Sequence, residues 1–373
     1  MRLLFIGPLP EPMTGQALAC RVILDRLPKT HRVDLINLSK PDFRPGFSSL
    51  SRASEVVRIL WAVWRKEKMA DAVYLTVSES AAGNAKDLLI YALCFSRLEH
   101  MVIHLLGGAN MRNILSRRRP VMRGLNVFFL RRLAGVIVEG ETQLEIYRDA
   151  IARERIHVVP NFAEDSLFTT NDQIDRKFSR PIPLRILFLS NLLPGKGHDE
   201  LVDAFLALDD KTRGSVEIDF AGGFESEAQK ERFVARIAGV ANIRYHGTVH
   251  GERKRDLLHH AHVFCLPTYY AYEGQPISIL EAYASGCAVI TTNHSGIRDV
   301  FRHEVNGLEV ATRSVADLES AIERAVARPQ FLHAVAKTNL ETALQRHRTA
   351  EYGRTVVSII ERAAAGGTAG ARP

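Results

Sequence analysis

The chain has 373 residues, which is more than one hydrophobic core usually supports and therefore predicts two domains. Hydrophobic residues make up 46% and charged residues 24% of the sequence, as in an ordinary globular protein, and the apolar runs are too short for the roughly 18 residues of a membrane span. The net charge is +7, and the four cysteines are far apart without metal-ligand spacing, so we interpret them as buried, reduced thiols.

The first half of the chain alternates strand and helix patterns. Gly7 and Pro8 interrupt the first apolar run too early for a signal peptide, so this run is predicted to be the first strand of a cytoplasmic protein. Helical spacing follows, for example at 15–27 and 55–64. Strands separated by crossovers predict a parallel sheet with helices on both faces. The strands are predicted at 3–6, 32–37, 72–77, 101–106, 135–139 and 156–159.

A polar stretch with three prolines, Pro160 to Pro183, separates this half from a second one, so residues 161–183 are predicted to form an interdomain linker. The second half repeats the alternation, with strands predicted at 185–189, 216–221, 243–246, 263–266, 287–291 and 308–310. The fold class is therefore α/β, with two Rossmann-like doubly wound domains, 1–160 and 184–345, facing a central cleft where a ligand would bind. Residues 346–373 are expected to form a helix that packs back on the first domain, followed by a flexible Gly/Ala-rich tail.

Arginines are concentrated in one segment, 112–132, which contains no acidic residue and interleaves the arginines with apolar side chains. Two interpretations stay open: a solvated helix face, or a surface that meets anionic lipid or phosphate, where each basic residue contributes about 1 kcal/mol. Nucleic acid is disfavoured because no reading motif accompanies the segment. The arginines are Arg112, Arg117, Arg118, Arg119, Arg123, Arg131 and Arg132.

Two loops of the first domain contain candidate binding residues. Gly15 follows the first strand and opens a helix, where a small residue lets backbone N–H groups approach a phosphate or a sugar, although a turn glycine is the commoner explanation. His104 lies near the end of the fourth strand, before Gly107 and Gly108. A lone strand histidine is more often a core residue than a catalytic one.

Lys196 and two glutamates are the candidates in the second domain. Lys196 lies between two glycines just before a helix N-terminus, which suits a diphosphate clamp, although a solvated turn lysine fits equally well and the spacing is not that of a P-loop. Glu273 and Glu281 lie at one strand-to-helix junction. They could act as the acid and nucleophile of a glycosidase, hold sugar or ribose hydroxyls, or serve structure alone.

The segment EGQPISILEAYASGCAVITT resembles the E-x7-E signature of the retaining GT-B glycosyltransferases of family 4, the glycosyl transferases group 1. Three further blocks extend this resemblance over nearly the whole chain. VVPNFAEDSLF is similar to the family's interdomain motif, FLSNLLPGKG to its diphosphate-binding segment, and IRYHGTVHGERKRDLLHHAHVFCLPT to the element before the acidic motif. The spacing of the blocks is more specific than any one of them.

The resemblance implies a retaining, metal-independent hexosyl transfer without a cofactor, from a nucleotide-sugar donor such as a UDP- or GDP-sugar. It implies that Glu273 contacts the donor sugar, that Glu281 contacts the ribose, and that Lys196 holds the diphosphate. His104 resembles the histidine of the acceptor-binding domain, and Gly15 the glycine of the first loop. The remaining donor-binding positions implied by the motif are Asn191, Gly274, Gln275, Pro276, Ile277 and Ser278.

Three departures from the family pattern accompany these matches. Asn191 stands where many members have arginine, Phe162 where the hinge motif often has glycine, and His294 begins a sequence that replaces a double glycine. The acceptor is expected to be a saccharide or a polyprenyl-diphosphate-linked saccharide of bacterial-type polysaccharide or glycoconjugate synthesis, with the arginine segment in peripheral contact with the inner membrane face. Alternatives are a sugar-nucleotide epimerase of the same architecture, a glycosidase, and a non-catalytic sugar-nucleotide-binding protein.

Overall fold

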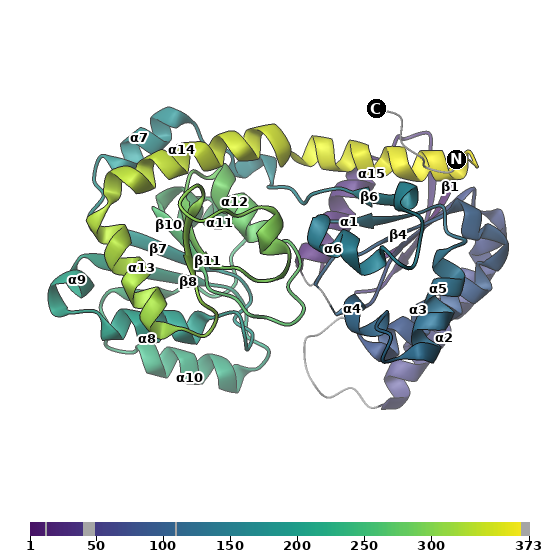
Figure 1. Ribbon diagram of the computed structural model, residues 1–373, viewed down its shortest axis with the longest axis horizontal. Helices are drawn as coiled ribbons and strands as arrows, with labels where there is room; N and C mark the ends of the chain where they lie inside the picture. The colour runs from purple at the N-terminus through teal and green to yellow at the C-terminus, as the bar shows by residue number, and fades with distance from the viewer. Residues whose placement is uncertain (12, 40–48, 109, 367–373) are drawn as a thin grey trace. The chain divides into compact units, whose positions relative to one another are not determined.

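The computed structural model describes residues 1–11, 13–39, 49–108 and 110–366, without the side chains of 49–52. The chain divides into two compact units, shown in Figure 1: Met1–Asn161 with Ala350–Pro373, and Phe162–Thr349. We call these the N-terminal unit and the C-terminal unit.

The N-terminal unit is built on a six-stranded sheet in which all neighbouring strands are parallel. The strand order is β2-β1-β3-β4-β5-β6. Every residue of β3, β4 and β5 is buried, as expected for strands covered by helices on both faces. The strands are β1 (Arg2–Gly7), β2 (Arg32–Asn37), β3 (Ala72–Thr76), β4 (Met101–His104), β5 (Gly135–Val138) and β6 (Ile156–Val158).

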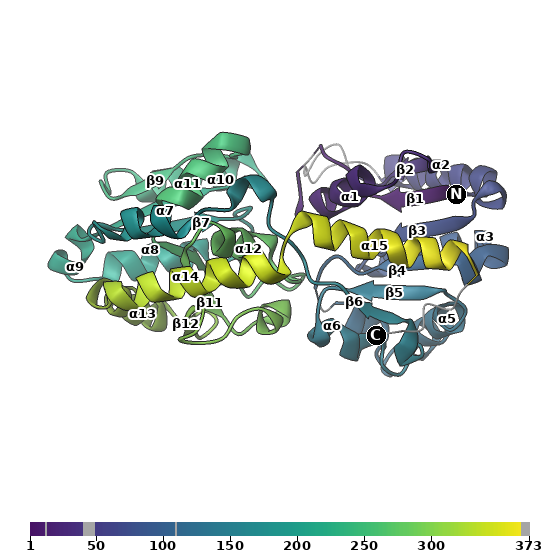
Figure 2. The same ribbon diagram turned by 90° about the horizontal axis from the view of Figure 1, so that it is seen from above.

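Helices connect these strands, and the last helix of the chain joins them. Thr14 caps the first helix by accepting a hydrogen bond from the N–H group of Ala17. The final helix, α15, packs on this unit (Figure 2), where His31 Nε2 lies 2.9 Å from Glu361 Oε1 and His100 Nδ1 lies 2.8 Å from the carbonyl oxygen of Ala363. The helices are α1 (Gly15–Arg26), α2 (Ser49–Lys66), α3 (Ala81–Leu93), α4 (Met111–Ile114), α5 (Pro120–Leu130), α6 (Glu141–Tyr147) and α15 (Thr349–Ala364), with short 3₁₀ turns η1 (Glu67–Met69), η2 (Phe95–His100) and η3 (Arg153–Arg155).

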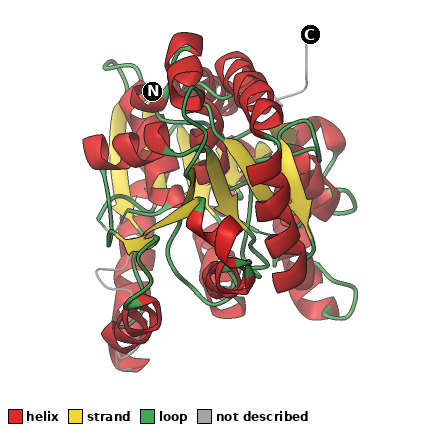
Figure 3. Ribbon diagram, turned by 90° about the vertical axis from the view of Figure 1, so that its left-hand side faces the viewer, coloured by secondary structure: helices red, strands yellow, loops and turns green. Residues whose placement is uncertain are grey.

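The C-terminal unit repeats this architecture with a second parallel sheet of six strands, in the order β12-β11-β10-β7-β8-β9. The strands are β7 (Leu184–Leu189), β8 (Val216–Ala221), β9 (Ile243–Tyr245), β10 (Val263–Leu266), β11 (Ala288–Thr292) and β12 (Gly307–Val310). Helices lie on both sides of the strands (Figure 3). They are α7 (Asn171–Phe178), α8 (His198–Ala207), α9 (Asp210–Gly214), α10 (Glu227–Ile237), α11 (Gly251–His260), α12 (Ile277–Ala284), α13 (Val315–Ala327) and α14 (Pro329–Arg346), with turns η4 (Asp165–Leu167) and η5 (Ser295–Asp299).

The prediction of an α/β fold with two doubly wound domains is confirmed, because twelve strands of the described residues lie in two such sheets, at the positions that the hydrophobic pattern indicates. The four cysteines are free and buried, as expected. No helix in the described ranges is long and apolar enough to cross a bilayer. The expectation of a flexible tail concerns mainly residues 367–373, which lie outside the described ranges.

The segment expected to be a linker has a different structure. Residues 162–183 belong to the C-terminal unit and contain α7, which begins with a capping box formed by Thr170 and Gln173. Ile174 and Phe178 of this helix are buried in the core of the unit. This helix was not predicted, because only two apolar side chains, four residues apart, lie on its buried face, which is too few to show a helical period.

The strand orders place one topological switch point in each sheet. In the N-terminal sheet, β1 lies between β2 and β3, and in the C-terminal sheet, β7 lies between β8 and β10. In the N-terminal sheet, the chain continues from β1 toward one edge and from β3 toward the other, so the loops after these two strands diverge. In the C-terminal sheet, the loops after β7 and β10 diverge in the same way. Open α/β sheets bind ligands in such crevices, at the carboxyl ends of the strands.

Candidate active site at the switch point of the C-terminal unit

Lys196 is held at this switch point by the two glycines beside it. The loop after β7 contains Gly195 with a φ angle of +91° and Gly197 with a φ angle of +85°, a left-handed conformation that side chains rarely adopt. A β-carbon on Gly197 would lie only 2.4 Å from the carbonyl oxygen of Pro267. The glycine pair thus allows the loop after β7 to press against the loop after β10.

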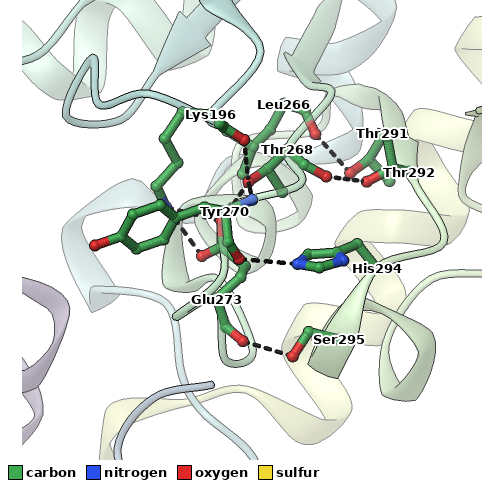
Figure 4. Close-up of polar contacts among 10 residues, drawn as sticks. Lys196, Leu266, Thr268, Tyr270, Glu273, Thr291, Thr292, His294 and Ser295 are labelled. Atoms are coloured by element: carbon green, nitrogen blue, oxygen red, sulfur yellow. Dashed lines mark hydrogen bonds and ion pairs between the residues drawn. The ribbon is translucent and has the colours of Figure 1, made fainter. Parts of the chain in front are cut away.

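The side chain of Lys196 meets the carboxylate of Glu273 across the switch point (Figure 4). Lys196 Nζ donates to Glu273 Oε1 at 3.0 Å and to Oε2 at 2.8 Å. Both side chains are largely buried, with 12% and 7% of their surface exposed. The ammonium also lies 5.0 Å from the ring centroid of Tyr270, and Thr268 donates its hydroxyl to Glu273 Oε2 at 2.8 Å. The carboxylate therefore has a fixed orientation.

The loop that carries Glu273 is supported from behind by the segment after β11. His294 Nε2 lies 2.8 Å from the carbonyl oxygen of Tyr270, and Ser295 donates its hydroxyl to the carbonyl oxygen of Glu273 at 2.5 Å (Figure 4). A β-carbon on Gly296 would lie 2.7 Å from the carbonyl oxygen of Gly274, so this position also needs a glycine. The sequence His294 to Gly296, which departs from the family pattern, is thus part of the frame of the site.

Glu281 lies on α12 and has a different lysine partner. Lys254 Nζ donates to Glu281 Oε1 at 2.6 Å and to Glu164 Oε1 at 2.7 Å. Burial raises the pKa of Glu281, and the Lys254 charge opposes that shift. Burial alone would lower the pKa of Lys254, but the charges of Glu281 and Glu164 raise it. The two glutamates of the motif are thus engaged separately, by Lys196 and by Lys254.

The other predicted donor-binding positions lie around the same junction. Residues Gly274, Gln275 and Pro276 form a buried connection between Glu273 and α12, and Ile277 and Ser278 form the first turn of that helix. The first N–H groups of a helix have no partner within it and carry the positive end of the helix dipole, which favours an anion. Asn191 lies in the loop after β7, beside Gly223. A β-carbon added to Gly223 would lie 3.7 Å from Asn191 Oδ1, which is ordinary van der Waals contact.

His104 belongs to the N-terminal unit. β4 ends at His104, so this residue belongs to the strand, and its side chain is fully buried. Its Nδ1 lies 2.8 Å from the hydroxyl of Tyr74, and burial lowers its pKa to about 3, which keeps the imidazole neutral. Gly15, by contrast, is exposed as the first residue of α1.

The arginine segment forms α4, α5 and the turns beside them. Its apolar residues are not all inside: Val121 is 75% exposed, and Leu125 and Phe128 are 48% and 44% exposed. The guanidinium of Arg132 lies 3.9 Å from the ring centroid of Phe128. The surface is therefore both basic and apolar.

Several residues of the site were not among the predicted ones. Thr268, Tyr270 and Ser295 orient Glu273 or its loop, and Lys254 and Glu164 engage Glu281. Thr268 could have been found as a polar residue just after a buried strand. The contact between Lys254 and Glu164 could not have been found from the sequence, because these residues lie 90 positions apart.

Comparisons with known proteins show which sequences and structures this chain resembles. Residues 171–342, which include the whole site except Glu164, match the family model of glycosyl transferases group 1. The chain is 28% identical over 189 residues to the amylovoran biosynthesis glycosyltransferase AmsK of Erwinia amylovora, covering 49% of this chain and 46% of that protein. It is 34% identical over 146 residues to the GDP-mannose-dependent alpha-(1-6)-phosphatidylinositol monomannoside mannosyltransferase of Mycobacterium tuberculosis, covering 37% of each protein. The matches thus span less than half the length of these relatives.

Among solved structures, the chain is similar to Anabaena HepE in complex with UDP and glucose. The TM-score is 0.70 at 16% sequence identity, and the match covers 97% of this chain and 99% of HepE. This likeness supports the assignment of the GT-B fold over almost the whole chain.

Proposed function

We propose that the protein is a glycosyltransferase that moves a hexosyl group from a nucleotide-sugar donor to a saccharide or lipid-linked saccharide, with retention of the anomeric configuration and without a metal ion. The observation that carries this proposal is the Lys196–Glu273 pair, which lies at the switch point of a unit whose sequence matches glycosyl transferases group 1. HepE, which binds UDP and glucose, and the GDP-mannose-dependent relative support a UDP- or GDP-sugar as the donor.

Each residue of the site has a role in this reaction. Lys196 and the N–H groups at the start of α12 bind the diphosphate and stabilise the negative charge that develops as it leaves. Glu273 accepts hydrogen bonds from hydroxyls of the donor sugar, and Glu281 binds the ribose. Because Lys196 already neutralises Glu273, this carboxylate binds the sugar and does not attack its anomeric carbon.

The transfer breaks the bond between the anomeric carbon and the diphosphate oxygen and forms one to the acceptor oxygen on the same face. The acceptor hydroxyl gives its proton to the departing phosphate oxygen, so the reaction needs no enzyme nucleophile. The intact nucleoside diphosphate is released. We assign the acceptor to the N-terminal unit.

The proposal is tested by thermal shift against a panel of UDP- and GDP-sugars, followed by product analysis with the sugar that binds. A matched donor at 100 times its dissociation constant should stabilise the fold by about 2.7 kcal/mol. Transfer that persists in excess EDTA, with an α-linked product from an α-linked donor, supports the mechanism. Isomerised nucleotide sugar would indicate an epimerase, free sugar without a nucleotide would indicate a glycosidase, and binding without turnover would indicate a scaffold.

We further propose that the arginine segment contacts anionic lipid at the inner membrane face. The exposed apolar residues of α5 continue onto its neighbours, because Phe95 stacks on Phe128 with ring centroids 6.3 Å apart and α3 packs against both α5 and α2. On α2, Trp61 and Trp64 are 54% and 56% exposed. Aromatic side chains beside arginines suit the boundary between headgroups and acyl chains.

Vesicle flotation tests this contact. The protein should float with vesicles that contain phosphatidylglycerol and stay behind with pure phosphatidylcholine. Arg117→Ser, Arg118→Ser and Arg119→Ser combined should weaken flotation, whereas Arg236→Ser in the C-terminal unit should not. Equal flotation of the triple variant and the wild type would refute the proposal.

A further inference from the structure

The segment after β11 contains a residue in a backbone conformation that its side chain disfavours. Ser295 has a φ angle of +49°, and the only other non-glycine residues with positive φ angles in the described part of the chain are Glu304 and Arg313. For a residue with a β-carbon this left-handed region costs free energy, and such residues persist where the surrounding structure holds them. Strain of this kind is often found at functional sites, and Ser295 hydrogen-bonds to the backbone of Glu273.

The residues after Ser295 hold it in this conformation by their packing. A β-carbon on Gly296 would lie 2.7 Å from the carbonyl oxygen of Gly274 and 2.9 Å from the backbone nitrogen of Gln275. The next residue, Ile297, is fully buried. Ser295 is therefore followed at once by a tight backbone contact and by a buried side chain, and together they fix its conformation.

Side chains at the end of β11 and just after it hydrogen-bond to backbone carbonyl oxygens at the end of β10 and in the loop that follows (Figure 4). The backbone pairing of these two strands ends at Leu266 and Thr291. Side chains take over from the backbone beyond this point, and they follow the loop as far as Glu273. The donors and their acceptors are Thr291 with Leu266, Thr292 with Thr268, His294 with Tyr270, and Ser295 with Glu273.

These hydrogen bonds act on the path of the loop and not on the carboxylate of Glu273. All of them end on backbone carbonyl oxygens, whereas the carboxylate is bound by Lys196 and by the hydroxyl of Thr268. Backbone and side chain of Glu273 are thus fixed by different groups. The double glycine of the family pattern has no side chains that could make such bonds, so they are a feature of the sequence His294 to Gly296 in this chain.

We infer that Thr292, His294 and Ser295 are positioning residues that hold residues 268–273, which we call the donor loop, in the conformation that binds the donor before the donor arrives. The inference rests on the proposed function for the identity of the ligand. Ordering the backbone of a single residue changes an equilibrium constant by a factor of about 5 to 30, so a loop that is ordered in advance binds its ligand more tightly.

Glycine at position 295 separates the effect on the donor loop from the effect on stability. Ser295→Gly removes the hydrogen bond to Glu273 but also relieves the strain of the positive φ angle. These two effects on stability oppose each other, so the midpoint of urea unfolding should stay within about 0.5 M of the wild type. Ser295→Ala loses the bond and keeps the strain, so it should be less stable than Ser295→Gly.

Two measurements on Ser295→Gly test the inference. Hydrogen–deuterium exchange followed by mass spectrometry should show exchange about tenfold faster in peptides that cover the donor loop, because one good hydrogen bond is lost. The dissociation constant of the UDP- or GDP-sugar that stabilises the wild type most should rise about tenfold. His294→Ala, which loses the bond to Tyr270, should change both quantities in the same direction. Glu304→Gly relieves a positive φ angle at an exposed position and is the control that should change neither.

Unchanged exchange in Ser295→Gly overturns the inference, and so does faster exchange with an unchanged dissociation constant, because order in the loop would then not matter for binding. In both cases the proposed function stands if the donor binds. If no UDP- or GDP-sugar binds the wild type, the proposed function fails and the exchange data decide alone: faster exchange in Ser295→Gly supports a loop held by this side chain, and equal exchange removes the inference as well.

Discussion

The two switch points of this protein bear glutamates in opposite electrostatic states. In the C-terminal unit, Glu273 is neutralised by Lys196 and oriented by Thr268. In the N-terminal unit, Glu79 has no such partner, and burial raises its pKa to about 8. The same sheet topology therefore carries a glutamate paired with a lysine in one unit and a glutamate with a raised pKa in the other, and the side chains of the adjoining loops make this difference.

The largest effect is expected at the Lys196–Glu273 pair. Lys196→Ala should lower turnover about 100- to 1,000-fold, because it removes the cation facing the leaving diphosphate and leaves Glu273 without its counter-charge. Steady-state kinetics with the matched donor measure the loss, and the exposed Lys211→Ala is the control. Turnover within threefold of the wild type would remove Lys196 from the mechanism.

Gly197 tests whether the C-terminal site depends on close contact between its two loops. Gly197→Ala should destabilise the C-terminal unit by about 3 kcal/mol, because alanine is strained at a φ angle of +85° and its β-carbon would meet the backbone of Pro267. Urea unfolding provides the measurement. Gly214→Ala, where a β-carbon has no neighbour within 4 Å, is the matched control and should change stability little.

Glu79 tests the opposite state in the N-terminal unit. Its pKa is about 8 in the folded protein and near the ordinary value of 4.5 when unfolded, so between these pH values the folded state holds the extra proton and stability falls as pH rises. Glu79→Gln has no such proton and should gain about 2 kcal/mol relative to the wild type between pH 5 and pH 8. Asp87, whose pKa is raised to about 6, titrates in both proteins and cancels in the comparison.

Urea unfolding of both proteins at four pH values gives this difference. A gap that stays constant across the range would show that Glu79 is ionised in the folded protein, and the contrast between the two switch points would disappear.

The smallest effect is expected at Thr268. Thr268→Val keeps the shape of the side chain but removes its hydrogen bond to Glu273, at a cost of about 1 kcal/mol. Because Lys196 still holds the carboxylate, turnover should fall only a few-fold. A loss as large as that of Lys196→Ala would show that the orientation of Glu273 matters as much as its neutralisation.

The sequence predicted the C-terminal site better than the N-terminal one, for physical reasons. The glycines on both sides of Lys196 indicate a loop whose backbone needs positive φ angles. The spacing of Glu273 and Glu281 indicates a strand-to-helix junction. Both signals lie within a short stretch of sequence. Glu79 has no local signature: its state depends on Gly107, Glu139 and the strand order that brings their loops together. No periodicity or spacing reveals that arrangement.

His104 and α7 show what sequence patterns predict and what they miss. His104 lies at the end of β4, as predicted, and its full burial agrees with the commoner interpretation of a core histidine. In α7, two apolar residues were too few to predict a helix from the sequence. The helix is stabilised by its capping box and by the packing of these two residues in the core.

The position of α15 in the sequence affects the order in which the two units can finish folding. Because the N-terminal unit contains Ala350–Pro373, its sheet emerges from the ribosome long before the helix that covers it. Val356, Ile360 and Ala363 of α15 are fully buried against that unit, so their partner surface stays uncovered while all of Phe162–Thr349 is being synthesised. Domains that are continuous in sequence can fold as they emerge. Of the two units, the one whose translation begins first is therefore the last that can finish folding, and a stop codon just before α15 would leave that unit incomplete and the C-terminal unit whole.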